Sequence, residues 1–263
     1  MIGFNKLGNH GHLGNQMFQY ASLRGIASKH EYEWCIPPEE SFGTAYDLRS
    51  SIYECFKLKS LKNKCFISTK TLEESHFHFD ENLFNNFPDN TNLMGYLQSE
   101  KYFKHIKKDI LNDFEFLDYI QEKSNKFLSR YEDKIKVSVH IRRTDYVTHA
   151  HFHVPSSLDY YSNAMDSFEH VIFFVFSDDV NWCKQQTIFD DKNVVFPEIN
   201  DKYIDFSIMS MCDHNIIANS SYSWWASYLN KNINKKVIAP SRWFGFACNL
   251  NDLYMDNWTV LQS

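Results

Sequence analysis

The stretch that decides the fold reads VSVHIRRTDY and occupies residues 137–146. Its first half is mostly apolar and predicts a buried β-strand at residues 137–141. The sequence then turns polar at once, with two arginines, a threonine and an aspartate at residues 142–145. Ligands of open parallel α/β sheets bind beyond the carboxyl ends of the strands. The stretch therefore predicts a sheet strand with a binding site at its end.

The charged end of this strand predicts an anion site. Alternate residues of a strand share a face, so His140 and Arg142 are expected to point the same way. The planar guanidinium of Arg142 can hold a diphosphate through two parallel hydrogen bonds. A purely structural alternative remains open at this point, in which Arg143 and Asp145 form a salt bridge.

The rest of the chain predicts an α/β protein of two halves. Apolar runs predict strands at residues 1–5, 30–36, 171–176, 194–196, 215–218 and 236–239. Helical patterns fall at residues 15–29, 99–133, 156–168, 179–187, 203–212 and 223–229. Strands that alternate with helices indicate a parallel sheet. Residues 40–90 show no clean period. We place the domains at residues 1–132 and 133–263.

Two further strand ends carry polar residues. After the run at 171–176, Asp178 suits hydrogen bonds from a ribose or a base, although Ser177 or Asp178 could instead cap the next helix. Asn219, Ser220 and Ser221 follow the strand at 215–218 and open a helix, which is a favourable place for an anion. A simple helix cap is again the alternative, and Trp224 and Trp225 are expected to pack in the core.

A glycine-rich loop follows the first strand. Gly11 and Gly14 would let the backbone approach a phosphate, with Asn15 and Gln16 beside them. The spacing is not GxGxxG, so this signal is weak by itself.

The bulk properties exclude some classes of protein. The net charge is −6 and the pI about 6.0, which argues against a nucleic-acid partner. No apolar run is long enough to span a bilayer, so a cytoplasmic location is predicted. The six cysteines show no framework spacing and are expected as buried free thiols. His149, His151 and His153 alternate, but lack Cys or carboxylate partners at metal-ligand spacing, and no metal is expected.

Four motifs together resemble the α-1,2-fucosyltransferases of glycosyltransferase family 11. The chain has HIRRTDY at 140–146, LGNQMFQYA at 13–21, FSDD at 176–179 and NSSYSWWA at 219–226, in the family's order. One departure is His12, where the family usually has a second glycine, and a Cβ there could alter the approach of the loop to the donor.

The resemblance implies a GT-B-like fold with two Rossmann-like halves and a cleft between them, with GDP-fucose bound mostly by the C-terminal half. Arg142 would hold the departing β-phosphate and Arg143 would support it, while His140 would lie near the nucleotide. The remaining donor-binding residues would be Gly14, Asn15, Gln16, Asp178, Asp205, Asn219, Ser220 and Ser221. Asp145 would act as a base or as a salt-bridge partner of Arg143.

The function expected from this resemblance is inverting, metal-independent transfer of L-fucose from GDP-fucose to the 2-hydroxyl of a galactoside. The acceptor would be a galactose-containing glycan of a bacterial polysaccharide such as O-antigen. It would be lipid-linked in some systems, which would bring the protein to the inner membrane. No cofactor is expected. The open alternatives are another linkage, another GDP-sugar, or a GDP-sugar binding module without catalysis. Acceptor contacts are expected at residues 40–130.

Overall fold

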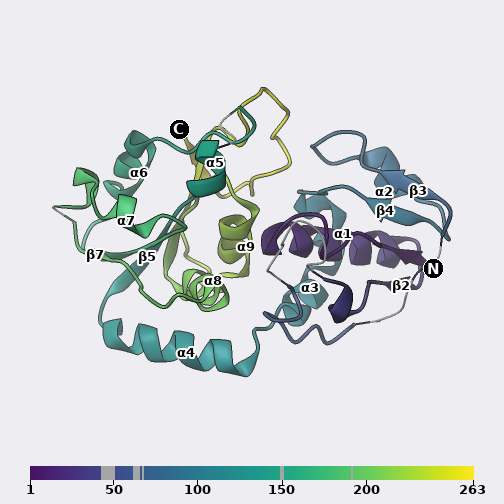
Figure 1. The fold of residues 1–263 in the computed structure, drawn as a ribbon, viewed down its shortest axis with the longest axis horizontal. Helices are drawn as coiled ribbons and strands as arrows, with labels where there is room; N and C mark the ends of the chain where they lie inside the picture. Colours follow the sequence, from purple (N-terminus) through teal and green to yellow (C-terminus); the bar gives the residue numbers. More distant parts are fainter. Residues whose placement is uncertain (43–50, 62–65, 67, 149–150, 191) are drawn as a thin grey trace. The chain divides into compact units, whose positions relative to one another are not determined.

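The computed structural model describes residues 1–42, 51–61, 66, 68–148, 151–190 and 192–263. The chain forms two compact units, each built on its own parallel sheet (Figure 1). The first unit holds Met1–Leu117 and Asn249–Tyr254, and the second holds Asp118–Cys248 and Met255–Ser263. The predicted boundary at residue 132 falls later than this division, because a helix that begins at Asp118 packs on the second unit.

The first unit contains a sheet of strand order β2-β1-β4-β3, in which every pair is parallel. Its strands are β1 (Ile2–Gly3), β2 (Trp34–Cys35), β3 (Thr71–Glu73) and β4 (Asn92–Met94). The strands expected at 1–5 and 30–36 are confirmed as β1 and β2. β3 and β4 were not predicted, because each has only three residues and β3 is largely exposed. Strands this short carry no readable alternation.

The helices of the first unit are α1 (Leu13–Lys29), α2 (Glu81–Asn86) and α3 (Lys107–Asp113). Short 3₁₀ turns add η1 (Glu39–Ser41), η2 (Glu100–Tyr102) and η3 (Lys104–Ile106). The helix expected at 15–29 is confirmed as α1. The continuous helical pattern expected at 99–133 is broken at residues 114–117, because the backbone there bonds to the segment at 55–57. Pairing with another segment overrides the local helical preference.

The second unit contains a parallel sheet of order β10-β9-β8-β5-β6-β7. Its strands are β5 (Ile135–Ile141), β6 (Val171–Ser177), β7 (Val194–Val195), β8 (His214–Ile216), β9 (Val237–Pro240) and β10 (Thr259–Leu261). The five strands expected in this half are confirmed as β5 to β9, and β10 was not predicted. The α/β class with two parallel-sheet halves is therefore confirmed.

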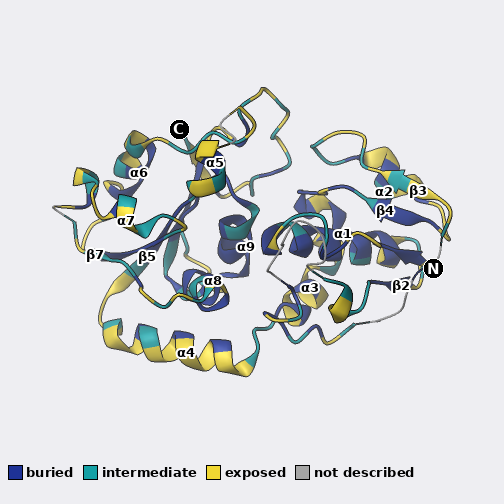
Figure 2. Cartoon of the chain, viewed as in Figure 1, coloured by how far each residue is buried: buried dark blue, intermediate teal, exposed yellow. Residues whose placement is uncertain are grey.

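The helices of the second unit are α4 (Asp118–Leu128), α5 (Thr144–Thr148), α6 (Leu158–Met165), α7 (Val180–Cys183), α8 (Lys202–Met211) and α9 (Ser221–Leu229). The 3₁₀ turns η4 (Ser129–Tyr131) and η5 (Thr187–Phe189) complete the list. α4 buries Ile120, Ser124 and Leu128 at four-residue spacing, and the rest of it is largely exposed (Figure 2). Trp224 and Trp225 are buried in α9, as predicted.

The alternation along β5 separates two faces of this sheet. Val137, Val139 and Ile141 join a core cluster with Tyr160 and Tyr161 of α6. The intervening residues face the other layer: Ser138 Oγ accepts a hydrogen bond from Asn215, and the His140 ring lies 5.4 Å from that of Tyr222 in α9. His140 thus lies on the α8–α9 side of the sheet.

The strand order places the reversal of the sheet beside β5. Starting from β5, the chain adds β6 and β7 on one side, then returns to lay β8 on the other. Parallel sheets bind ligands at the carboxyl ends of the two strands where the order reverses. In this unit those ends are the residues after Ile141 and after Ile216.

Candidate functional site

The loop after β5 is fixed by a carboxylate at the end of β6. Asp178 accepts hydrogen bonds from the backbone N–H groups of Arg143 (2.9 Å) and Thr144 (3.1 Å), and from the Thr144 hydroxyl. Burial alone would raise the pKa of Asp178, but the charge of Arg142 and these hydrogen bonds lower it below its ordinary value. Both carboxylate oxygens are thus engaged in shaping the loop. The nucleoside role of Asp178 remains a prediction.

Arg142 lies at the centre of this loop. Its Nε is 2.8 Å from Asp145 Oδ1, and its Nη1 is 3.3 Å from Asp178 Oδ2. The guanidinium carbon lies 5.8 Å from the Tyr146 ring, and 28% of the side chain is exposed. Burial lowers the pKa of Arg142, but the carboxylates raise it by more, so the side chain stays charged.

Arg143 turns away from Arg142 and toward α7. Its Nε lies 3.3 Å from Asp179 Oδ2, and its guanidinium carbon lies 3.6 Å from the centre of the Trp182 ring. The expected salt bridge between Arg143 and Asp145 is therefore wrong: Asp145 pairs with Arg142 instead. The expected helix cap also differs by one residue, because Asp179 accepts from Trp182 N and caps α7.

His140 is a buried, neutral group at the end of β5. Burial, followed by the charge of Arg142, lowers its pKa to about 4. Its Nδ1 is buried and has no hydrogen-bond partner among the described residues. Such an atom is an unused acceptor or donor beside Arg142, which is unusual for a buried polar group.

The end of β8 supplies a helix cap and an anchor. Ser220 caps α9 by accepting from Tyr222 N, and Ser221 is the first residue of that helix. The Asn219 side chain donates to Val154 O and Trp243 O, each at 3.0 Å, and its backbone carbonyl accepts from the Tyr146 hydroxyl at 2.8 Å. The simple-cap interpretation thus holds for Ser220. Asn219 holds neighbouring loops in place.

Asp205 lies in the first turn of α8. Burial and the nearby Asp201 raise its pKa to about 7. Its Oδ1 is buried and accepts no hydrogen bond from the described residues. Tyr222 was not among the predicted site residues, yet it links β5 to α8: its ring lies beside His140, and its hydroxyl donates to Lys202 O in α8. Its place between two helix-start serines was the available signal.

The predicted donor loop of the first unit is built from backbone and amides. Gly14, Asn15 and Gln16 form the first turn of α1. Gln16 donates to Gly11 O and accepts from Ile52 N, while Asn15 Oδ1 accepts from the Gln98 side chain. These side chains shape the loop.

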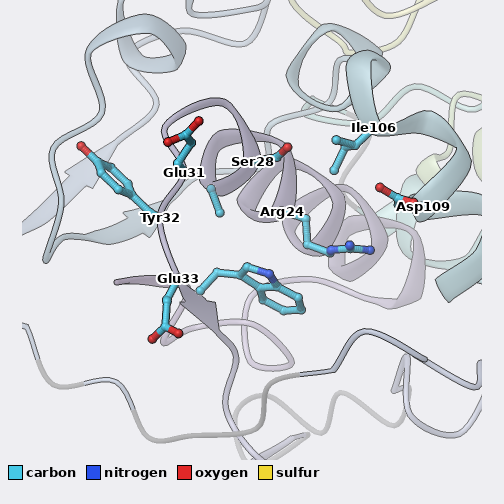
Figure 3. A pocket seen from close by; sticks show the side chains of 9 residues that line it. Arg24, Ser28, Glu31, Tyr32, Glu33, Ile106 and Asp109 are labelled. Atoms are coloured by element: carbon cyan, nitrogen blue, oxygen red, sulfur yellow. The ribbon is translucent and has the colours of Figure 1, made fainter.

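Two hollows lie on the described surface, one of them away from the site and one beside it. One of about 320 Å³ lies in the first unit between the second half of α1, the start of β2 and the Ile106–Asp109 segment, and Figure 3 shows Arg24 and Asp109 on one side of it. The other, of about 430 Å³, lies at the ends of β6 and β7 and includes Asp178, Asp179 and Glu198. The first is about four helical turns from Gly14.

No metal site is evident in the part of the chain that the structure describes, where no group of three His, Cys, Asp or Glu side chains is placed to hold an ion. His149 lies outside the described residues, and His153 stacks on Tyr146 at 4.5 Å.

The buried free thiols are, as predicted, Cys35, Cys55, Cys183 and Cys212. Cys248 is only half-buried, and Cys65 lies outside the described residues. None of the described helices combines the length and apolar character needed to cross a bilayer.

The geometry is that of a candidate anion site in a Rossmann-like unit. A cationic Arg142, a neutral His140 and the capped start of α9 meet where the sheet reverses. The model of glycosyl transferase family 11 matches residues 1–262, and the chain belongs to that family. The predicted family and the predicted class of enzyme, a glycosyltransferase, are both confirmed.

Curated relatives agree with this assignment. The chain is 30% identical to an alpha-1,2-colitosyltransferase of Escherichia coli, over 89% of this chain and 90% of the relative. It is 40% identical to the O-antigen biosynthesis glycosyltransferase WbnK of Escherichia coli, over 49% of this chain and 46% of that one. It is 26% identical to the galactoside 2-alpha-L-fucosyltransferase SEC1 of Bos taurus, over 83% of this chain and 62% of the relative.

Solved structures share the fold. POFUT1 in complex with GDP-fucose superposes with a TM-score of 0.55 at 13% identity, over 88% of this chain and 92% of that one. The alpha-1,6-fucosyltransferase NodZ, co-crystallised with GDP, gives 0.53 at 13% identity, over 87% and 92%. These likenesses confirm the GT-B-like fold class.

Proposed function

We propose that this chain is an inverting α-1,2-fucosyltransferase that moves L-fucose from GDP-fucose to the 2-hydroxyl of a galactoside. The single observation that carries the proposal is the position of Arg142, which lies at the end of β5 where the parallel sheet reverses. The loop that presents it is fixed by Asp178. A cation held in place before the reaction stabilises charge that develops in the transition state.

The reaction requires stabilisation of a leaving diphosphate. The oxygen of the acceptor hydroxyl forms a bond to C1 of fucose while the bond from C1 to the β-phosphate breaks, and GDP departs with the electron pair. Arg142 is the group assigned to take up this charge, while Asp145 and Asp178 hold its guanidinium in place. A β-linked donor then gives an α-fucoside. Family resemblance and the positive charge of Arg142 support this step without a metal.

We assign the nucleoside to the region beside the starts of α8 and α9. A carboxylate that accepts no bond, such as Asp205 Oδ1, suits the N–H donors of guanine, and a neutral His140 Nδ1 offers one more polar contact. Tyr222 lies beside His140 and Phe206 and supplies a ring surface. The N-terminus of α9 at Ser220 and Ser221 supports the phosphates.

Asp145 is the candidate for the group that accepts the acceptor proton. A general base must lie within hydrogen-bond reach of the proton it removes. Asp145 is near the leaving-group cation and is 43% exposed on its side chain, so an acceptor can reach it. If Asp145 serves only to orient Arg142, Asp145→Asn lowers kcat without removing an ionisation from the pH–rate profile.

The direct test is an assay of purified protein with GDP-fucose and β-galactoside acceptors in EDTA. The expected result is release of GDP with an acceptor mass gain of one deoxyhexose, and attachment at the 2-position. Release that disappears in EDTA and returns with Mg²⁺ would overturn the metal-independent mechanism. Release of GDP without a fucosylated product, with every acceptor tried, would show that the protein hydrolyses the donor and would contradict the proposed transfer.

A second donor has a specific observation in its favour. The relative aligned over nine-tenths of both chains is named a colitosyltransferase, and colitose is fucose without its 3-hydroxyl. GDP-colitose should therefore be run beside GDP-fucose at equal concentration. A higher kcat/KM for GDP-colitose would replace the donor assignment while keeping the reaction and the role of Arg142. The O-antigen relative supports a glycan acceptor of a bacterial surface polysaccharide.

A further inference from the structure

A cluster of phenylalanines lies on the surface of the second unit. It consists of Phe152, which follows α5 in the chain, and of Phe244 and Phe246, which follow β9; we call these three residues the aromatic ledge. Phe152 is 47% exposed and Phe246 49%, while Phe244 is buried beneath them. The rings of Phe244 and Phe246 are parallel at 5.1 Å, and Phe152 meets both edge-on. Two large apolar rings half-exposed side by side are a feature of binding surfaces.

The aromatic ledge is connected to Arg142 by stacked rings. Tyr146, whose ring lies 5.8 Å from the Arg142 guanidinium carbon, stacks on His153 at 4.5 Å with an interplanar angle of 10°. His153 in turn contacts Phe152 at 4.9 Å and Phe244 at 5.8 Å. The ledge therefore begins only two rings away from the cation that is assigned to the leaving group.

The two segments of the ledge are tied together by backbone hydrogen bonds. Gly245 N donates to Phe152 O at 2.9 Å. The buried Asn219 amide donates to Val154 O on one segment and to Trp243 O on the other. Figure 1 shows the loop after β9, in yellow, beside α5. These bonds hold the exposed rings at a set position relative to the end of β8, which preorganised binding requires.

We infer that the aromatic ledge is an acceptor subsite, in which Phe152 and Phe246 stack on the apolar face of the sugar that receives the transferred residue. This inference rests on the proposed function. The C3, C4 and C5 hydrogens of a galactoside form one apolar face, and C–H groups carry partial positive charge that the negative face of a phenyl ring attracts. Acceptor contacts therefore extend beyond residues 40–130, where the sequence placed them.

The charge of the chain favours a sugar over a lipid surface. The protein carries a net charge of −6, and anionic bilayers attract clusters of Lys and Arg. Across residues 151–154 and 243–248 the chain carries no Lys or Arg. Neutral rings joined to a reaction centre suit a neutral saccharide.

The test compares ring-removing with ring-keeping substitutions. Phe152→Leu and Phe246→Leu keep an apolar side chain but remove the ring, and we expect the KM for the galactoside to rise roughly 2- to 10-fold for each, with the KM for the sugar nucleotide unchanged. Phe152→Tyr and Phe246→Tyr keep the ring and should restore the acceptor KM. Ile233→Ala, at a residue 94% exposed in the same unit, is the matched control and should behave like the unmodified protein.

Each outcome decides between specific interpretations. Leucine variants with the native acceptor KM overturn the subsite. If the leucine variants bind phosphatidylglycerol vesicles less than the unmodified protein does, while their acceptor KM is unchanged, the ledge is assigned to a membrane. This outcome also overturns the acceptor subsite. If the unmodified protein releases no GDP from any sugar nucleotide, the proposed function fails on its own. Saturation-transfer NMR with a β-galactoside then still tests the ledge, because binding there does not need the donor.

Discussion

The loops that follow the first strand of each sheet are built by opposite means. In the first unit, the loop after β1 turns through Gly8 (φ 86°) and Gly11 (φ 98°) and is stabilised by the amide side chains of Gln16 and Gln19. In the second unit, the loop after β5 is held by the charged groups Arg142 and Asp178 with their partners. Glycines bring a backbone close to a ligand, whereas paired charges hold a cation ready. The leaving-group role that we propose for Arg142 therefore belongs to the second loop.

The sharpest way to break this comparison is to remove the cation. Arg142→Ala should lower kcat by roughly 10²–10³, the usual cost of losing a preorganised transition-state contact. Measured fucosyl transfer from GDP-fucose provides the test, and thermal unfolding checks that the variant folds. Arg142→Lys keeps the charge but loses the planar guanidinium, so its kcat should lie between those of the unmodified protein and of Arg142→Ala. Near-native turnover of the alanine variant would refute the assigned role.

The next change loosens the loop and removes one of the two carboxylates that pair with Arg142. Asp178→Asn should lower the free energy of unfolding by about 1–3 kcal/mol, because the amide cannot accept at both positions. The folded-state pKa of Asp178 is lowered, so its contribution is present at neutral pH and is lost as the pH falls below about 3.8 through that lower pKa. Urea unfolding at several pH values measures this. Asp166→Asn, in an exposed ion pair with Lys192, should change stability by less than about 1 kcal/mol.

The neutral histidine beside Arg142 predicts a distinct pH dependence. The pKa of His140 is about 4 in the folded protein against an ordinary 6.5, so the unfolded chain binds the extra proton first as the pH falls. The free energy of unfolding should therefore rise between about pH 4 and 6.5 and level off above it. His140→Gln should reduce this slope. Burial of His10, His105 and His214 lowers their pKa values too and adds to this slope, whereas the raised pKa values of Glu74 and Asp205, each about 7, oppose it. An unchanged slope in the variant would contradict the assignment.

The last contrast compares two neighbouring residues of the glycine loop. A Cβ at Gly11 would lie 2.5 Å from Asn15 Nδ2 at a φ of 98°, so Gly11→Ala should cost about 1–3 kcal/mol. His12 has φ −81° and ψ −174°, an extended conformation open to any residue, and makes no side-chain cap bond. His12→Gly should therefore cost less than Gly11→Ala, because the native residue at position 12 has no strained backbone conformation. Urea midpoints of both variants measure the contrast, and equal losses would contradict it.

The sequence predicted the sheet of the second unit well because its central strands are long and apolar. β5 and β6 form unbroken buried runs, whereas β3 is short and exposed and gave no pattern. The position of Arg142 at a strand end also followed from the sequence. Its partner did not, because a single residue of spacing decides whether Asp145 meets Arg142 or Arg143. The use of Asn219 as an anchor between two distant loops depends on tertiary contacts that no local pattern contains.

The wholly parallel sheets affect how the protein regains its structure. Parallel neighbours cannot be joined by a tight hairpin, so every strand pair needs a long connection. β1 pairs with β4 through Gly3 and Asn92, which are far apart in the chain. Closing such a long loop costs chain entropy before the paired strands contribute any stabilising free energy. Chains dominated by such pairs therefore refold slowly. Unfolding and refolding of the variants above therefore have to be followed over long incubation times. A urea midpoint can be taken only when the unfolding and refolding curves coincide.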